Sequence, residues 1–137
     1  MEKLHRKPNP SGLEDRGDFL IRGLWTRGTD CIGDVCVVNV HAPSYADTTP
    51  TALLRANEVR KKTHYLRACH DQRRDFTPVV VSCEGMLGPE ANTLLKRITF
   101  KLAEKWHRPY SQVASFVKSK FAIALLRAKS RCLEAHA

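Results

Sequence analysis

The chain has 137 residues and a formal net charge of +9, from 23 Lys and Arg against 14 Asp and Glu. This length accommodates one compact domain and excludes an enzyme built from several ordinary domains. The apolar content of 42% lies near the globular range, and the positive charge favours a polyanionic partner.

The cysteine pattern indicates a reducing compartment. Five cysteines are spread along the chain without a CxxC motif, and no secretory leader follows Met1. The longest weakly charged apolar run, Phe121 to Leu126, is far shorter than the roughly twenty residues of a membrane span. We therefore expect an intracellular protein, with the nucleus as one location, and no contact with a membrane.

The first half of the chain predicts a β-hairpin. Residues 1–17 mix charge with Pro and Gly and show no apolar period, so we expect a flexible N-terminal segment. A strand is expected from Phe19 through Trp25, followed by a turn at Thr26 to Thr29 and a nearly apolar strand from Cys31 to Val40.

The second half predicts three helices and one further strand. A helix of about twenty residues should enter at Thr49 or Thr51 and fade by Asp75. A buried strand, Phe76 to Cys83, should follow, and then two helices, Glu90 to His107 and Ser111 to Cys132. This order predicts one α/β domain over residues 18–137, with a thin mixed sheet of a hairpin plus one strand covered by helices.

The first helix has two faces. At about 100° per residue, one side carries Ala56, Val59, Thr63, Leu66 and His70. The other side carries Glu58, Lys61, Lys62 and Tyr65. By default, such a charged side is a solvated helix face with ion pairs between successive turns.

Acidic residues gather near the predicted hairpin. Residues 1–50 hold six basic and seven acidic side chains, whereas residues 51–137 hold seventeen and seven. Asp18 starts the first strand and Asp34 lies inside the second. Two carboxylates on adjacent strands, beside a basic helix, suit Mg²⁺ or Mn²⁺ acting on a phosphodiester. A lysine from the helix could orient the attacking water.

The same residues carry a family resemblance. The run DFLIRGLWTRGTDCIGDVCV from Asp18, the helix segment EVRKKTHY from Glu58 and the strand FTPVVVSCEGMLG resemble the restriction-like endonuclease domain of non-LTR retrotransposon reverse transcriptases. That domain belongs to the PD-(D/E)XK superfamily. The resemblance implies a small three-layer domain cut from a longer ancestor, with Asp18 and Asp34 as metal ligands in a magnesium-dependent DNA endonuclease.

The resemblance also implies roles for the helix face. Cys36 stands where the superfamily usually has its lysine, and in these elements that lysine has moved to the following helix in a K-x-x-K-Y pattern. The matching stretch ends at Tyr65, with His64 in place of the second lysine, so Lys61 becomes the catalytic candidate. Glu58, Lys62 and Tyr65 would support it.

The two C-terminal helices offer a second kind of contact. Six cations could track phosphates along them, although a solvated face is the simpler interpretation: Lys96, Arg97, Lys101, Lys105, Lys118 and Lys120. The neighbouring aromatic residues lie mostly at core spacing, and we do not expect them to stack on bases: Trp106, Tyr110, Phe116 and Phe121.

Other interpretations stay open. Asp34 could be a structural residue paired with Arg22 or Arg27, and a zinc site is disfavoured because Cys31 and Cys36 should point to opposite faces of a strand. The alternative function is a non-catalytic basic module that binds DNA or RNA. A third possibility is a fragment that does not fold alone.

Overall fold

The structure is a computed structural model that describes residues 18–135, apart from the side chains of 128, 129 and 131–135. The expected flexible segment 1–17 lies outside this range. The described elements are, in chain order, β1 (Phe19–Arg22), β2 (Asp30–Val38), the short 3-10 helix η1 (Pro43–Tyr45), α1 (Pro50–Asp71), β3 (Asp75–Ser82), α2 (Pro89–Trp106) and α3 (Tyr110–Ala135).

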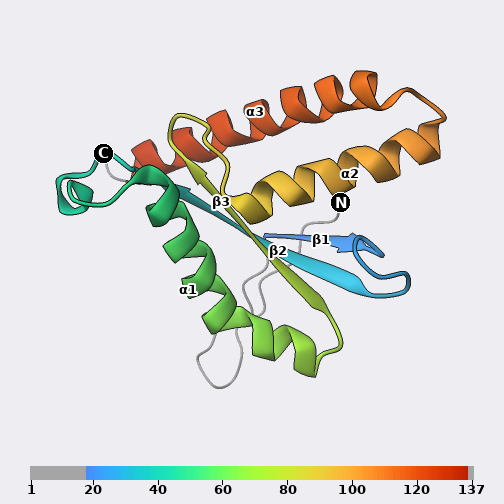
Figure 1. Cartoon of the computed structure of the whole chain (residues 1–137), viewed down its shortest axis with the longest axis horizontal. Helices are drawn as coiled ribbons and strands as arrows, with labels where there is room; N and C mark the ends of the chain where they lie inside the picture. The colour runs from blue at the N-terminus through green and yellow to red at the C-terminus, as the bar shows by residue number, and fades with distance from the viewer. Residues whose placement is uncertain (1–17, 136–137) are drawn as a thin grey trace.

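The three strands form one mixed sheet in the order β1-β2-β3. β1 pairs antiparallel with β2, and β2 pairs parallel with β3 after the crossover through α1. Helix α1 covers one face of the sheet, and α2 with α3 covers the other (Figure 1). The predicted α/β fold, a short mixed sheet covered by helices, is thus confirmed.

The α2 side of the sheet carries the main apolar core. Its buried members come from the turn after β1, from β2, β3 and α2, namely Leu24, Cys31, Val79, Val81, Ala91 and Leu94. The ring of Phe19 lies directly on Gly33, where a Cβ atom would be 1.9 Å from the ring. Glycine at 33 therefore lets an aromatic side chain of β1 lie flat against β2.

The α1 side carries two smaller clusters. One contains Val38, Val40, Leu53, Leu54 and Val80, and the other contains Leu20, Ile32, Cys69 and Phe76. Asp34 lies on β2 between Ile32 and Val38, so a charged side chain separates the two clusters. Burial of a carboxylate in such a position is costly unless a partner compensates it.

The hairpin is shorter than the apolar pattern predicts. β1 ends at Arg22 because Gly23 turns the chain with a φ of +66°. The turn is then fixed from outside, since Lys101 Nζ donates to the Gly23 carbonyl at 2.7 Å and Arg97 Nε donates to the Leu24 carbonyl at 2.9 Å. Leu24 is buried although it lies outside the strand.

The start of α1 agrees with the sequence. The Thr49 side chain accepts a hydrogen bond from the Ala52 N–H at 3.2 Å, and Pro50 is the first helical residue. The helix ends at Asp71, four residues before the expected limit, because Arg73 adopts a φ of +57° and turns the chain into β3.

The outer edge of β3 is closed by the following loop. The Gly88 N–H donates to the Val80 carbonyl at 2.8 Å, and the Ser82 N–H donates to the Met86 carbonyl at 2.8 Å. Pro78, nearer the start of the strand, has no N–H to offer. These features prevent a further strand from pairing along this edge.

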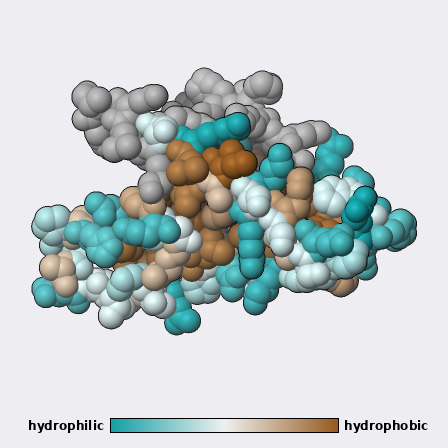
Figure 2. Space-filling model, turned by 90° about the horizontal axis from the view of Figure 1, so that it is seen from above, coloured by the Kyte–Doolittle hydropathy of each residue, from teal (hydrophilic) through white to brown (hydrophobic). Residues whose placement is uncertain are grey.

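Helix α3 is only partly covered. Val113 and Val117 are buried, whereas Phe116, Ile123 and Leu126 are exposed. Figure 2 views the molecule from the α3 side and shows apolar atoms gathered near the middle of this face, with polar side chains around them. Within residues 18–135, none of the helices combines the length and apolarity needed to span a bilayer.

Candidate functional site

Two carboxylates meet where β1 begins beside β2. Phe19 pairs with Gly33, so the antiparallel register places Asp18 opposite Asp34. Asp18 Oδ2 accepts a hydrogen bond from the Val35 N–H at 2.7 Å, which anchors this exposed side chain to β2. Asp34 itself is only 6% exposed. The predicted pairing of Asp18 with Asp34 across adjacent strands is therefore present.

Lys61 reaches this pair from α1. Its Nζ atom lies 2.7 Å from Asp34 Oδ2, and its side chain is 21% exposed. The ammonium also lies 5.6 Å from the centroid of the Tyr65 ring, within cation–π range. The partner of Asp34 is thus Lys61, and the alternative of Arg22 or Arg27 as its partner was wrong.

The electrostatics of Asp34 reflect both burial and a like charge. Desolvation, followed by the hydrogen bond and negative charge of Asp18, raises the pKa of Asp34 to about 6, although Lys61 opposes this shift. Burial lowers the pKa of Lys61, but the close contact with the Asp34 carboxylate and its negative charge outweigh burial and leave that pKa above its ordinary value. At neutral pH Asp34 is therefore mostly ionised, and Lys61 carries a positive charge.

One oxygen of this site lacks a well-directed donor. Asp34 Oδ2 is fully buried, and within the part of the chain that the structure describes it receives no hydrogen bond of good geometry. Its contact is the ion pair with Lys61. A buried carboxylate oxygen in this state still has capacity for a donor or a cation.

The donor set fits a hard divalent cation only together with a substrate. Among the described residues, no group of three or more His, Cys, Asp or Glu side chains could hold a metal ion. Mg²⁺, however, is commonly bound through one or two carboxylates plus waters and substrate phosphates. Asp18 and Asp34 provide the two carboxylates for such a site.

Glu58 does not join these carboxylates. It is 4% exposed, and its Oε2 accepts a hydrogen bond at 2.7 Å from the Glu90 N–H in the first turn of α2. A Cβ atom at Gly88 would lie 2.7 Å from the same oxygen, so glycine is required there. Burial raises the pKa of Glu58, and the backbone donor opposes this rise. The contacts of Glu58 are those of a helix cap.

Lys62 also contacts α2. Its Nζ atom lies 2.5 Å from Glu90 Oε1, and both side chains are partly exposed, at 40% and 29%. The side of α1 expected to be solvated therefore packs on the sheet and on α2. Val59, on the opposite side, is 63% exposed.

Tyr65 lies at the rim of the smaller core. Its ring centroid is 5.5 Å from that of Phe76 and 4.4 Å from that of His64, with the His64 and Tyr65 rings in an edge-to-face arrangement. Tyr65 therefore anchors α1 to β3 and flanks Lys61. His64 is exposed.

Two further residues near Lys61 escaped the sequence analysis as site candidates. Burial raises the pKa of the Cys36 thiol, while Lys61 and Arg60 lower it through their charges and Arg60 through a hydrogen bond. Cys36 lies two residues after Asp34 and so shares its face of β2. The spacing of two residues from Asp34 could have identified Cys36 as a neighbour of the site. No sequence pattern pointed to Arg60.

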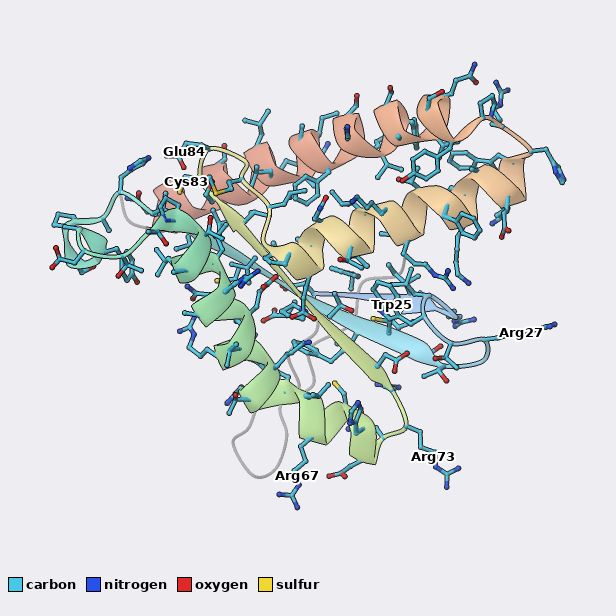
Figure 3. All side chains as sticks on the ribbon, in the orientation of Figure 1. Trp25, Arg27, Arg67, Arg73, Cys83 and Glu84 are labelled. Atoms are coloured by element: carbon cyan, nitrogen blue, oxygen red, sulfur yellow. The ribbon has the colours of Figure 1, made fainter. Side chains whose placement is uncertain are left out.

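The predicted phosphate-binding cations divide into two groups. Arg97 and Lys101 hold the hairpin turn through carbonyl groups, as described above. The other four, which are exposed on α2 and α3, are Lys96, Lys105, Lys118 and Lys120. Arg67 and Arg73 point away from the protein at the end of α1 (Figure 3), where they add positive charge on the other side of the sheet.

A separate pocket of about 320 Å³ lies between α1, β3 and the start of α2. It is lined by Trp25, Leu66, His70, Asp75, Phe76, Thr77, Glu90 and Thr93. Trp25 Nε1 donates to Thr77 Oγ1 at 2.9 Å, and Figure 3 shows Trp25 between α2 and the sheet. None of Asp18, Asp34 and Lys61 lines this pocket.

No protein-family model, curated protein or solved structure matches the chain.

Proposed function

We propose that this domain binds nucleic acid and cleaves phosphodiester bonds with a divalent cation held by Asp18 and Asp34. The observation that carries the proposal is the carboxylate pair itself, one member buried, beside Lys61 at 2.7 Å. A structural ion pair needs a single carboxylate. A second carboxylate opposite the first raises the energy of the site: burial is the main cause that raises the pKa of Asp34 to about 6, and the contact with Asp18 raises it further.

The residues of the chain would divide the chemistry. Asp18 and Asp34 would hold Mg²⁺ or Mn²⁺, which supplies Lewis acidity toward a phosphate oxygen. Lys61 has donors that can orient the scissile phosphate or a water molecule. Tyr65 would keep the Lys61 stem in place through its contact with the ammonium group.

The substrate class rests on charge and on motif order. The net charge of +9 favours a polyanion, and the four exposed lysines of α2 and α3 extend positive charge beyond the site. The order of Asp18, Asp34 and Lys61 along the chain resembles that in the restriction-like endonuclease domain of non-LTR retrotransposons. This resemblance favours DNA as substrate, with RNA second, and a nuclear location.

The competing function is a binding module without catalysis. It is favoured by the Lys61–Asp34 ion pair, because an ammonium group at 2.7 Å already compensates one carboxylate without a metal. This module would bind nucleic acid with a steep dependence on salt and with no response to EDTA.

Plasmid nicking with and without Mg²⁺ or Mn²⁺ separates the two functions. We expect metal-dependent nicking by the natural chain and a loss on the order of 10³-fold in Asp34→Asn, because one ligand is removed. Asp30→Asn, on the same strand but away from the pair, is the matched control and should keep full activity.

Metal binding provides a second readout. Mn²⁺ titration followed by electron paramagnetic resonance should show weakened binding in Asp18→Asn and Asp34→Asn, with thermal melts confirming that both variants fold. Nicking that persists in Asp34→Asn would refute the assignment. Unchanged Mn²⁺ binding in both variants would do the same.

A further inference from the structure

The connection between α2 and α3 exposes an aromatic and cationic cluster. Trp106, the last residue of α2, is 42% exposed, and Phe116 on α3 is 46% exposed. Their ring centroids are 5.5 Å apart in an edge-to-face arrangement, and Lys120 Nζ lies 5.5 Å from the Phe116 centroid. These three residues are called the tip cluster below. In Figure 1 the connection between α2 and α3 lies at the end of these two helices that points away from α1.

The rings are not needed to fill the core. Among the described side chains of α3, Val113 and Val117 are buried, at 2% and 7% exposure, and Phe121 and Leu125 also pack against the core. The tip cluster lies outside them, and the expectation that Trp106 and Phe116 occupy core positions was therefore wrong. The edge-to-face contact fixes the two rings relative to each other while leaving about half of each side chain open to solvent.

The charge around the tip cluster favours an anionic partner. Residues 101–120 contain five Lys and Arg and one Glu, for a net charge of +4. Lys101 is engaged with the Gly23 carbonyl, whereas Lys105, Arg108 and Lys118 are exposed beside the tip cluster in sequence. A neutral apolar protein surface would have to desolvate these cations without compensation. Phosphates combined with flat bases match both the charge and the rings.

We propose that the tip cluster stacks on bases of a single-stranded nucleic acid while Lys105 and Lys118 contact its phosphates. This surface goes beyond the proposed metal site, because it lies on other elements and needs no divalent cation. It would allow the domain to hold an unpaired strand independently of cleavage.

The test is fluorescence anisotropy with a fluorescein-labelled twelve-nucleotide oligo(dT) in EDTA, which prevents metal-dependent cleavage. We expect Trp106→Leu to weaken binding about tenfold, within the range for loss of one stacked base, although leucine keeps the site apolar. Trp106→Phe keeps a ring and should lose less. Ile123→Ala, at a site equally exposed at 46% on α3, is the matched control and should bind within twofold of the natural chain.

Four measurements decide the outcome: affinity at raised salt, binding of a duplex, affinity for oligo(dT) and the oligomeric state. The loss in Trp106→Leu should persist at raised salt, because stacking is less sensitive to salt than phosphate contacts. The same oligonucleotide in a duplex should bind with no dependence on Trp106, because its bases are paired. Equal affinity of Trp106→Leu and the natural chain for oligo(dT) would overturn the proposal, as would a dimer of the natural chain that Trp106→Leu dissociates.

Failure of this proposal can be distinguished from failure of the metal site. Asp34→Asn should bind oligo(dT) as the natural chain does, and Trp106→Leu should bind Mn²⁺ normally.

Discussion

Two halves of one helix face do different work in this protein. Glu58 and Lys62 contact the first turn of α2, where one accepts the Glu90 N–H and the other pairs with the Glu90 carboxylate. Lys61 and Tyr65, on the same side of α1, contact Asp34 and β3. The difference shows that a shared helix face does not imply a shared role. What each side chain does depends on the element opposite it.

The largest effect on stability is expected from removing the contact of Glu58 with α2. Glu58→Ala leaves the Glu90 N–H without its buried acceptor and opens space beside Gly88, so we expect a loss of roughly 3 kcal/mol in the free energy of unfolding. Glu58→Gln keeps an acceptor oxygen and should lose about 1 kcal/mol. Urea denaturation measures both variants.

Mn²⁺ binding is the control for this comparison. It should be unchanged in Glu58→Gln, because Glu58 contacts α2 and lies apart from the Asp18–Asp34 pair. A stable Glu58→Gln variant that fails to bind Mn²⁺ would move Glu58 into the metal site and remove the distinction between the two halves.

The second prediction concerns the pH dependence of stability that arises from Asp34, the partner of Lys61. The pKa of Asp34, about 6 in the folded chain, exceeds the value of about 4 expected when unfolded, so the folded chain holds this proton more tightly. The resulting stabilisation is complete below pH 4 and is lost as the pH rises through 6. The side chain of the Asp34→Asn variant cannot ionise, so the stability of this variant does not fall for this reason as the pH rises.

The measurement is the free energy of unfolding of both proteins in EDTA at pH 4 and pH 7. The advantage of Asp34→Asn over the natural chain should grow by roughly 2 to 3 kcal/mol between these values. Mg²⁺ at pH 7 should reduce that advantage, because it stabilises only the natural chain. A difference that stays constant with pH would show that Asp34 is not held at a raised pKa.

The smallest effect is expected for Lys62. Its ion pair with Glu90 is partly exposed, so Lys62→Ala should cost at most about 0.5 kcal/mol, and less at high salt. Thermal melts at two salt concentrations check this, and nicking activity should be unchanged. A large loss of activity with intact stability would place Lys62 with Lys61, as the resemblance implied.

Much of the fold could be predicted from the sequence because the residues that begin helices and the spacing of apolar residues indicate the same elements. Thr49 and Pro50 begin α1, Pro89 begins α2, and the apolar runs give β2 and β3. The hairpin ends were less accessible, because Leu24 continues the apolar pattern after Gly23 has already turned the chain. A strand pattern alone cannot distinguish burial in a strand from burial beside one.

The candidate site was only half accessible. Asp18 and Asp34 could be paired from a hairpin register, which is local in sequence. The roles of Glu58 and Lys61 could not be separated from the sequence. A helical wheel places both side chains on one side of α1, but it does not show which neighbouring element each of them contacts along the helix axis. The exposure of Trp106 was missed for the same reason, since its spacing fits a core position, whereas in the structure other residues of α2 and α3 fill the core.

By itself, the sequence determined the α/β order of elements, the acidic hairpin and the basic helices that follow it, because these depend on residue type and local period. Only the tertiary structure decided that Asp34 pairs with Lys61, that Glu58 caps α2, and that Trp106 at the end of α2 and Phe116 on α3 stay exposed. These outcomes depend on contacts between segments far apart along the chain, which local patterns do not encode.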